Sequence, residues 1–173
     1  MWSKLWQLLM RSATQENILG QKTLLIIFEE YAMMTEFKRI YFDTTPLIYY
    51  LDSVQLYAQK VRSFIAESLA RESSFMTSTI ANTEYLVIPF RVQDYEKVME
   101  FEHFKRILNL EIIFVDNSVS TQAARIRAKY KGIKGMDSIH LATAIVYGCD
   151  VFLTNDKQLK QVEEINVLLV DEL

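Results

Sequence analysis

Four carboxylates stand out because each lies among otherwise apolar or small residues: Asp43, Glu84, Asp137 and Asp156. Carboxylates that are forced together repel one another, and each then resists ionisation. A divalent cation removes that cost, and Mg²⁺ binds carboxylate oxygens while it keeps waters and accepts phosphate oxygens as further ligands. One or two such ions can activate a water for in-line attack on a phosphodiester. If the four side chains meet, the sequence predicts Mg²⁺- or Mn²⁺-dependent phosphodiester chemistry.

Each of these acids, taken singly, also has a structural interpretation. Asp43 and Asp137 are equally suited to capping the helices that follow them. Glu84 alone is more typical of a solvated acid on a helix, and Asp156 could serve as a turn residue or as a cap. Their joint placement is what favours a shared site.

That placement follows from the elements that must carry the acids. Short apolar segments predict strands at 40–42, 75–77, 112–115, 151–153 and 167–170. Segments with helical spacing lie between them, which predicts right-handed crossovers and a mostly parallel sheet. The expected fold class is therefore α/β, a three-layer α/β/α sandwich with a five-stranded sheet. Ligands of such sheets bind beyond the carboxyl ends of the strands, where all four acids are expected.

The helices are predicted from apolar spacing and from cap residues. Thr44 and Thr79 are expected to cap the first and third of them, and Pro89 to bend or end the third. A helix is expected to start near Met136 or Asp137. The predicted helical segments are 44–51, 53–71, 79–89, 94–108, 119–130, the segment from about 136, and a short helix near 158.

Composition narrows the chemistry. The chain has 173 residues, near the usual size of one domain. One Cys and two His exclude a disulfide framework, a Cys-based zinc site and a His-rich metal site, so a metal would sit mainly on oxygen. The net charge of −3 argues mildly against nucleic-acid binding. If the four acids belong to a metal site, removing their charges from −3 leaves +1 for the rest.

The ends of the chain suggest how it is organised. No apolar run reaches the length of a membrane span, and polar residues interrupt any signal-peptide core near the start, so we expect a cytoplasmic protein without a membrane partner. Residues 1–37 differ from the regular pattern that follows and are expected to be an extension of a domain at 38–173. This extension could reflect an upstream start choice, with Met33 or Met34 as the natural start, or an added helix or partner-binding arm.

The four acids stand within segments that resemble a known family. The segments are Tyr41–Ile48 (YFDTTPLI), Ser78–Glu84 (STIANTE), Gly135–Ala144 (GMDSIHLATA) and Phe152–Lys157 (FLTNDK). In this order and spacing they resemble a PIN domain and, more narrowly, the VapC-type toxins of prokaryotic toxin–antitoxin pairs. The resemblance covers about residue 37 to the end. Ser138 departs mildly from the small residue, often Ala, that usually follows the third acid.

The resemblance implies a metal-dependent endoribonuclease that acts as the toxin of a type II system. It assigns Asp43, Glu84, Asp137 and Asp156 to the acidic quartet that holds Mg²⁺ or Mn²⁺ and carries out catalysis. Thr44 and Thr154 would be the hydroxyls that support the ligands. The implied partners are an RNA substrate, a cognate antitoxin and a second copy of the chain in a homodimer.

Basic residues precede the third acid. Arg125, Lys131 and Lys134 are candidates for binding the RNA backbone, although such a run is usually a solvated helix face. Tyr130 could stack on a base, but its helical spacing with Ile126 favours the core.

His140 follows Asp137 by three residues and lies between Ile139 and Leu141. No Cys/His or Ser/His set stands near it in the sequence. It is therefore more typical of a satisfied core histidine than of a catalytic group.

Two other function classes stay open at this level. One is a phosphoacceptor or phosphatase on a similar scaffold, although residue 45 is Thr where the Asp-x-Asp-x-Thr pattern needs Asp. The other is a non-catalytic PIN-like binding module that keeps the acidic pocket as a relic.

Overall fold

The computed structural model describes residues 37–173. Of the expected extension at 1–37, only Phe37 is among them, so the expectations for that extension lie outside the described residues. Phe37 packs against the core of the domain, and its carbonyl accepts a hydrogen bond from Ser73 Oγ at 2.6 Å.

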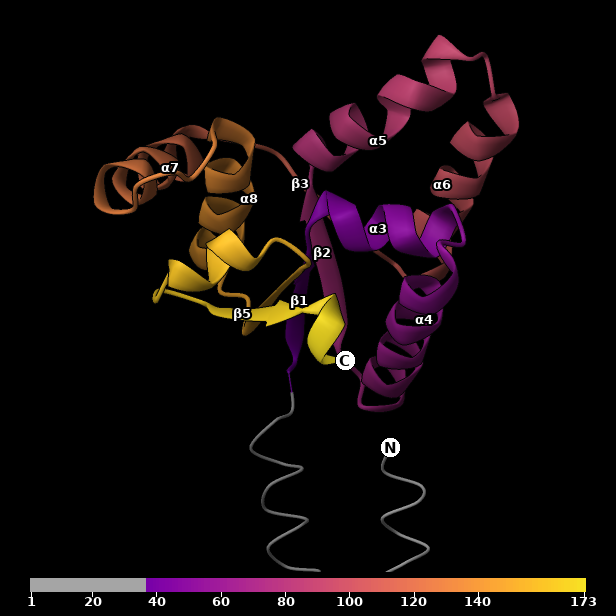
Figure 1. Ribbon diagram of the computed structural model, residues 1–173, viewed down its shortest axis with the longest axis horizontal. Helices are drawn as coiled ribbons and strands as arrows, with labels where there is room; N and C mark the ends of the chain where they lie inside the picture. Colours follow the sequence, from indigo (N-terminus) through magenta and orange to yellow (C-terminus); the bar gives the residue numbers. More distant parts are fainter. Residues whose placement is uncertain (1–36) are drawn as a thin grey trace, which may run out of the picture. The chain divides into compact units, whose positions relative to one another are not determined.

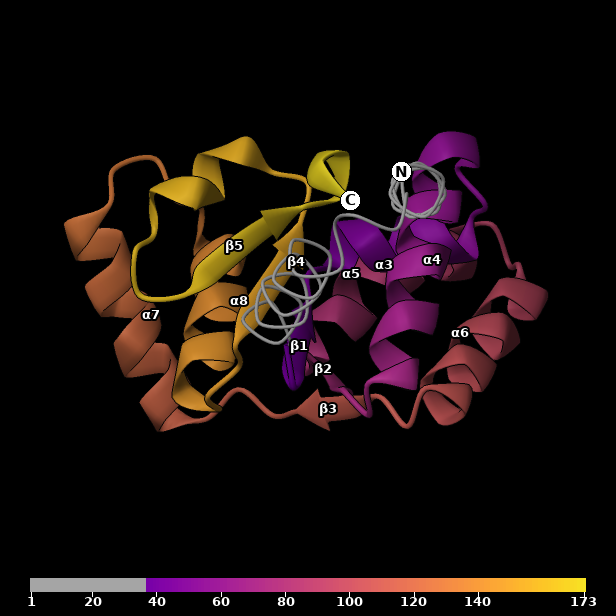
Figure 2. The same cartoon turned by 90° about the horizontal axis from the view of Figure 1, so that it is seen from below.

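Five parallel strands form one sheet in the order β3-β2-β1-β4-β5 (Figure 2). In the central strand, Tyr41 pairs with Met76 on one side and with Phe152 on the other. This confirms the predicted five-stranded parallel sheet. The strands are β1 (Arg39–Phe42), β2 (Ser74–Ser78), β3 (Glu111–Ile113), β4 (Val151–Thr154) and β5 (Asn166–Leu169).

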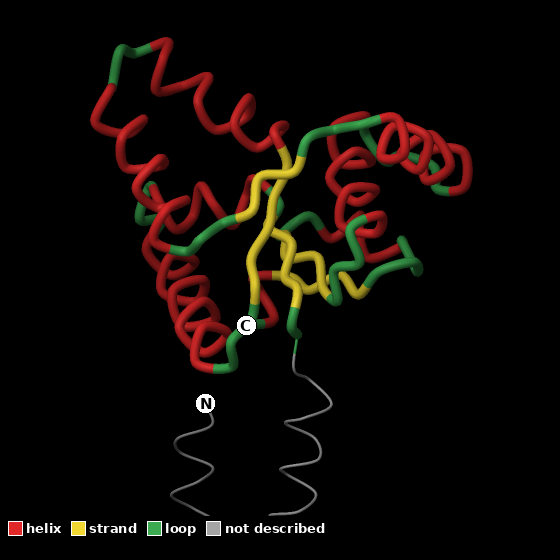
Figure 3. Tube along the Cα trace, turned by 180° about the vertical axis from the view of Figure 1, so that it is seen from behind, coloured by secondary structure: helices red, strands yellow, loops and turns green. Residues whose placement is uncertain are grey.

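Helices cover both faces of the sheet, which gives the predicted three layers (Figures 1 and 3). One face carries α3 (Thr44–Leu51), α4 (Gln55–Ala70), α5 (Thr79–Arg91) and α6 (Tyr95–Ile107). The other carries α7 (Asn117–Lys129) and α8 (Gly135–Val146). Two short 3₁₀ helices, η1 (Lys157–Gln161) and η2 (Val170–Glu172), flank β5. Among residues 37–173, no helix combines the length and apolar character that crossing a bilayer requires.

The alternation of side chains along β1 explains why the core has two halves. Ile40 and Phe42 point to the face that packs against α3 to α6, while Tyr41 points to the face that packs against α7 and α8. All three are fully buried. Because both faces of a covered parallel sheet exclude water, its strands need continuous apolar sequences. That requirement is why the strands could be predicted from apolar runs.

The caps of two helices lie one residue before the predicted Thr44 and Thr79, although both helices begin at the predicted residues. Asp43, not Thr44, caps α3, and Ser78, not Thr79, caps α5 through its hydroxyl and the N–H of Ile80. Pro89 does not end α5, which continues to Arg91. Its ring is buried, and in the last turn of a helix the missing N–H costs a single hydrogen bond.

Candidate active site

The site forms where β1 and β4 end side by side. Phe42 pairs with Leu153, and the next N–H, of Asp43, donates to the Leu153 carbonyl at 3.0 Å. Asp43 therefore leaves the sheet directly beside Thr154. Asp156 follows two residues after β4, Glu84 lies in the second turn of α5, and Asp137 lies in the first turn of α8. The predicted sheet edge thus carries all four acids.

Asp43 is a buried carboxylate with donors on both oxygens. Its Oδ1 accepts from the N–H of Thr44 at 2.8 Å, and its Oδ2 accepts from Thr154 Oγ1 at 2.6 Å. Burial raises the pKa of Asp43, although His140 and the Thr154 hydroxyl act against this shift. Only 8 % of the residue is exposed. Asp43 is thus both the helix cap of α3 and a buried charge at the sheet edge, so its capping role leaves a role in a shared site open.

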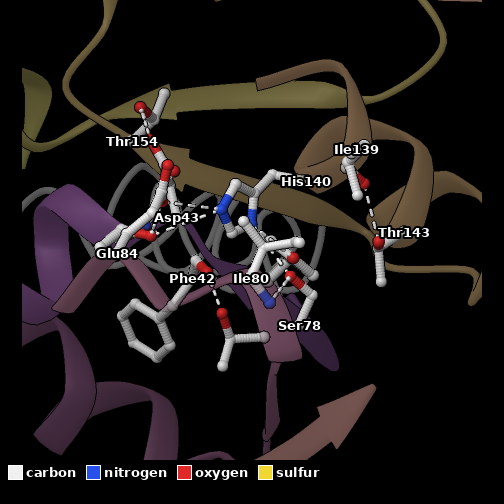
Figure 4. A network of polar contacts seen from close by, with 12 residues as sticks. Phe42, Asp43, Ser78, Ile80, Glu84, Ile139, His140, Thr143 and Thr154 are labelled. Carbon is white, nitrogen blue, oxygen red and sulfur yellow. Dashed lines mark hydrogen bonds and ion pairs between the residues drawn. The ribbon is translucent and has the colours of Figure 1, made fainter. Parts of the chain in front are cut away.

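Glu84 receives two hydrogen bonds on one oxygen (Figure 4). The hydroxyl of Thr44 donates to Oε2, and His140 Nε2 lies 3.1 Å from the same atom. The hydrogen bond with His140 lowers the pKa of Glu84, against the effect of its partial burial. Glu84 is therefore held by the site rather than free on a solvated helix face.

Asp137 and Asp156 complete the acidic edge, which is the end of the sheet that carries Asp43, Glu84, Asp137 and Asp156. Burial raises the pKa of Asp137, and the negative charges of Asp156 and Glu84 raise it further. Asp137 does not cap α8, whose N-cap position is Lys134. Asp156 caps η1 through Oδ1 and the N–H of Gln158 at 2.9 Å, and its own N–H donates to Thr154 Oγ1 at 3.1 Å. Thr154 thus links Asp43 to Asp156.

The donor set suits a hard cation, but the side chains do not form a closed cage. Within residues 37–173, no three or more His, Cys, Asp or Glu side chains are arranged to hold a metal ion. Mg²⁺ often binds through one or two carboxylates and fills its shell with water and phosphate. The charge of Glu84 raises the pKa of Asp43 and that of Asp137, which places Glu84 within electrostatic reach of both. A cation would offset the cost of their buried negative charge.

His140 is the residue whose contact with the site the sequence did not reveal. It is 1 % exposed, and its Nδ1 lies 2.8 Å from the hydroxyl of Tyr41. The prediction of a buried histidine with satisfied nitrogens is confirmed, but its bond to Glu84 was missed. One signal could have indicated it, since residues three apart share a helix face and His140 follows Asp137 by three.

The basic candidates differ in their relation to the acids. Lys134 stands at the start of α8, and its charge lowers the pKa of Asp137 against the larger effect of burial. Arg125 points to Gln122 on its own helix, at 3.4 Å, and Lys131 is exposed. Tyr130 packs against the α7–α8 core and donates its hydroxyl to Glu164 at 2.6 Å, as expected of a core residue.

The sequence of residues 40–165 matches the family described as PIN domain, a span that includes all four acids. The chain belongs to the PIN domain family. Among curated proteins, none matches it.

Solved structures share this PIN fold at low sequence identity. VapBC2 from Rickettsia felis, bound to a DNA fragment from its promoter, has a TM-score of 0.64 at 15 % identity and covers 76 % of this chain and 98 % of its own. A toxin–antitoxin complex from Klebsiella pneumoniae has a TM-score of 0.53 at 22 % identity, covering 78 % and 99 %. DNA-bound VapBC from Salmonella typhimurium has a TM-score of 0.54 at 14 % identity, covering 76 % and 98 %. Identities this low show a shared fold.

Proposed function

We propose that this PIN domain is a Mg²⁺- or Mn²⁺-dependent endoribonuclease and the toxin of a type II toxin–antitoxin system. The observation that carries the proposal is the buried carboxylate of Asp43 at the end of β1, which lies within electrostatic reach of Glu84 and shares Thr154 as a hydrogen-bond partner with Asp156. A buried charge whose pKa is raised by desolvation destabilises the fold unless a cation or substrate uses it. The fold of toxin–antitoxin complexes supports the biological role.

In this proposal the residues of the chain have separate tasks. Asp43, Glu84, Asp137 and Asp156 would hold the cation, directly or through its bound waters, and the cation would supply an activated water and stabilise the leaving oxygen. Thr154 orients Asp43 and Thr44 orients Glu84 through the hydrogen bonds described above. Lys134 stands beside Asp137 and would attract the backbone phosphate of RNA. Arg125 and Lys131 would contact phosphates further along the bound RNA.

Exposed apolar side chains near the junction of α5 and α6 support a protein partner. This junction lies away from the sheet in Figure 1. Apolar side chains that gather on a surface are typical of protein–protein contacts, and we propose that an antitoxin and a second copy of the chain are the partners. The exposed residues are Val87, Ile88, Phe90, Val92, Tyr95 and Met99.

The test is RNA cleavage by purified protein with Mg²⁺ or Mn²⁺. We expect products with 5′-phosphate and 3′-hydroxyl ends, no cleavage in EDTA, and no cleavage by Asp137→Asn. Full activity in EDTA would refute the metal dependence. Protein that binds Mn²⁺ but cleaves no RNA, even after any co-purified antitoxin has been removed, would contradict the nuclease proposal.

Aspartyl phosphorylation by acetyl phosphate separates the phosphoacceptor class, because only that class predicts a phosphorylated Asp. Calorimetric titration with Mn²⁺ separates the binding-module class. A relic pocket without ligand geometry should bind Mn²⁺ weakly or not at all, whereas the nuclease should bind it at the acidic edge.

A further inference from the structure

A buried histidine connects the acidic edge to the core of the α7–α8 face. His140 lies between Glu84, which is one-third exposed, and Tyr41, which is fully buried. The Tyr41 ring is held by Phe152, with stacked centroids 5.3 Å apart, and it meets the His140 ring edge-on at 5.9 Å. The imidazole is thus fixed on both sides, and Figure 4 shows it reaching from α8 toward Glu84.

The partners of the ring decide which nitrogen carries the hydrogen. A carboxylate only accepts hydrogen bonds, so the contact of Nε2 with Glu84 Oε2 requires hydrogen on Nε2. Nδ1 lies 2.8 Å from the Tyr41 hydroxyl, to which a neutral ring accepts and a protonated ring donates, so either state keeps this hydrogen bond. Burial raises the pKa of Tyr41, which keeps this hydroxyl protonated. Ser78 Oγ lies farther from Nδ1, at 3.4 Å.

The same geometry divides the two oxygens of Glu84. Within residues 37–173, the hydrogen bonds to its carboxylate fall on Oε2, from Thr44 and from His140. Two donors on one oxygen fix the rotation of the carboxylate and leave Oε1 as the oxygen available to a cation. A long Glu side chain on a helix would otherwise lose rotamer freedom each time it binds a ligand.

We propose that Tyr41 and His140 form a positioning pair that orients Glu84 for the cation. The proposal rests on the proposed function, because it gives Glu84 a ligand role, and it adds two residues that touch neither cation nor RNA. Partners that orient a metal ligand typically change metal affinity by roughly tenfold to a hundredfold when they are removed.

Three variants separate positioning from packing, and Mn²⁺ affinity by calorimetry is the readout. His140→Leu fills the space without a donor and should weaken Mn²⁺ binding by roughly tenfold to a hundredfold. His140→Gln keeps an N–H near the place of Nε2 and should recover most of that loss. Tyr41→Phe deletes only the hydroxyl and should give a smaller loss. Thermal unfolding of each variant shows that the folded protein is being titrated.

A double-variant cycle measures whether the loss of Mn²⁺ affinity in His140→Leu depends on Glu84. A merely structural role of His140 would not show this dependence. Because His140 acts through Glu84, the loss from His140→Leu should disappear when Glu84 is already Gln. Equal losses in both backgrounds would overturn the inference. So would a folded His140→Leu protein with unchanged Mn²⁺ affinity.

Nitrogen-15 NMR of the histidine rings tests the geometry without any metal or RNA. We expect hydrogen on Nε2 of His140, and a shift of its Nδ1 resonance in Tyr41→Phe. A ring without hydrogen on Nε2 would overturn this inference and leave the proposed function standing. Wild-type protein that binds no Mn²⁺ would overturn the proposed function, together with the positioning role that rests on it.

Discussion

The two ends of the strand pair β1–β4 each carry an aspartate, and the two aspartates have opposite surroundings. Asp43 follows β1 at the carboxyl end and is buried, with one oxygen bound by a side chain and the other by a backbone N–H. Asp150 precedes β4 at the amino end and is exposed. Its Oδ2 accepts from the N–H of Lys38 at 2.7 Å and of Arg39 at 2.8 Å, which fixes the entry of β1 into the sheet.

The difference shows how one residue type serves two purposes on one sheet. At the amino end, water solvates the carboxylate and its hydrogen bonds stabilise the strand. At the carboxyl end, burial makes the charge of Asp43 costly, and Glu84 lies within electrostatic reach of it. Only the second environment gains from a cation, so the comparison predicts catalysis at one end and stability at the other.

The largest expected effect is the loss of RNA cleavage in Asp43→Asn, for which Asp150→Asn is the matched control. Asp43→Asn keeps the shape and the helix cap but removes a ligand charge, and should lower RNA cleavage by roughly a thousandfold or more. Asp150→Asn removes a charge from the same strand pair and should cleave at the wild-type rate. Rate measurements on both purified proteins check this, and similar losses in the two would break the comparison.

A smaller effect is expected from Lys134, the basic side chain beside the acidic edge. Lys134→Ala should weaken RNA binding by roughly threefold to tenfold, because one phosphate contact is lost. Arg125→Ala and Lys131→Ala should have weaker effects, and Arg71→Ala, at the end of α4, serves as the control at the opposite end of the sheet. Filter binding at two salt concentrations measures this. A loss for Arg71→Ala equal to that for Lys134→Ala would contradict the assignment.

The acidic edge should also limit stability. The raised pKa of Asp137 means that its ionisation in the folded state opposes folding, so its own contribution to stability falls as pH rises from the ordinary value of 3.8 through the raised pKa. In EDTA at neutral pH, Asp137→Asn should therefore melt a few degrees higher than wild type, and the difference should narrow as pH falls toward about 4. A variant that melts lower than wild type in EDTA would contradict the cost assigned to this end.

The smallest effect is expected at the amino end. Asp150→Ala removes the acceptor of two backbone N–H groups and should lower the free energy of unfolding by about 1 kcal/mol. Denaturant unfolding measures it, with Asp150→Asn as a control that keeps one acceptor oxygen. Unchanged stability of Asp150→Ala would show that water replaces this acceptor fully.

Much of the fold could be predicted because its causes are local or periodic. The buried strands are apolar runs, and helical spacing marks the helices between them. Cap positions were less predictable: Asp43 and Thr44 are both good caps, and the choice depends on where the chain leaves the sheet. The persistence of α5 past Pro89 likewise depends on burial of the proline ring, which is a tertiary contact.

The sequence by itself determined the parallel three-layer sheet, its acidic edge and the hard, oxygen-based chemistry available there, because these follow from apolar patterning and residue type. Only the tertiary structure decided which donors bind which carboxylate oxygen. Thr154 is 111 residues from Asp43, Thr44 is 40 from Glu84, and His140 is 56 from Glu84. Hydrogen bonds are short and directional, so such pairings are set by the packing of distant elements and not by spacing along the chain.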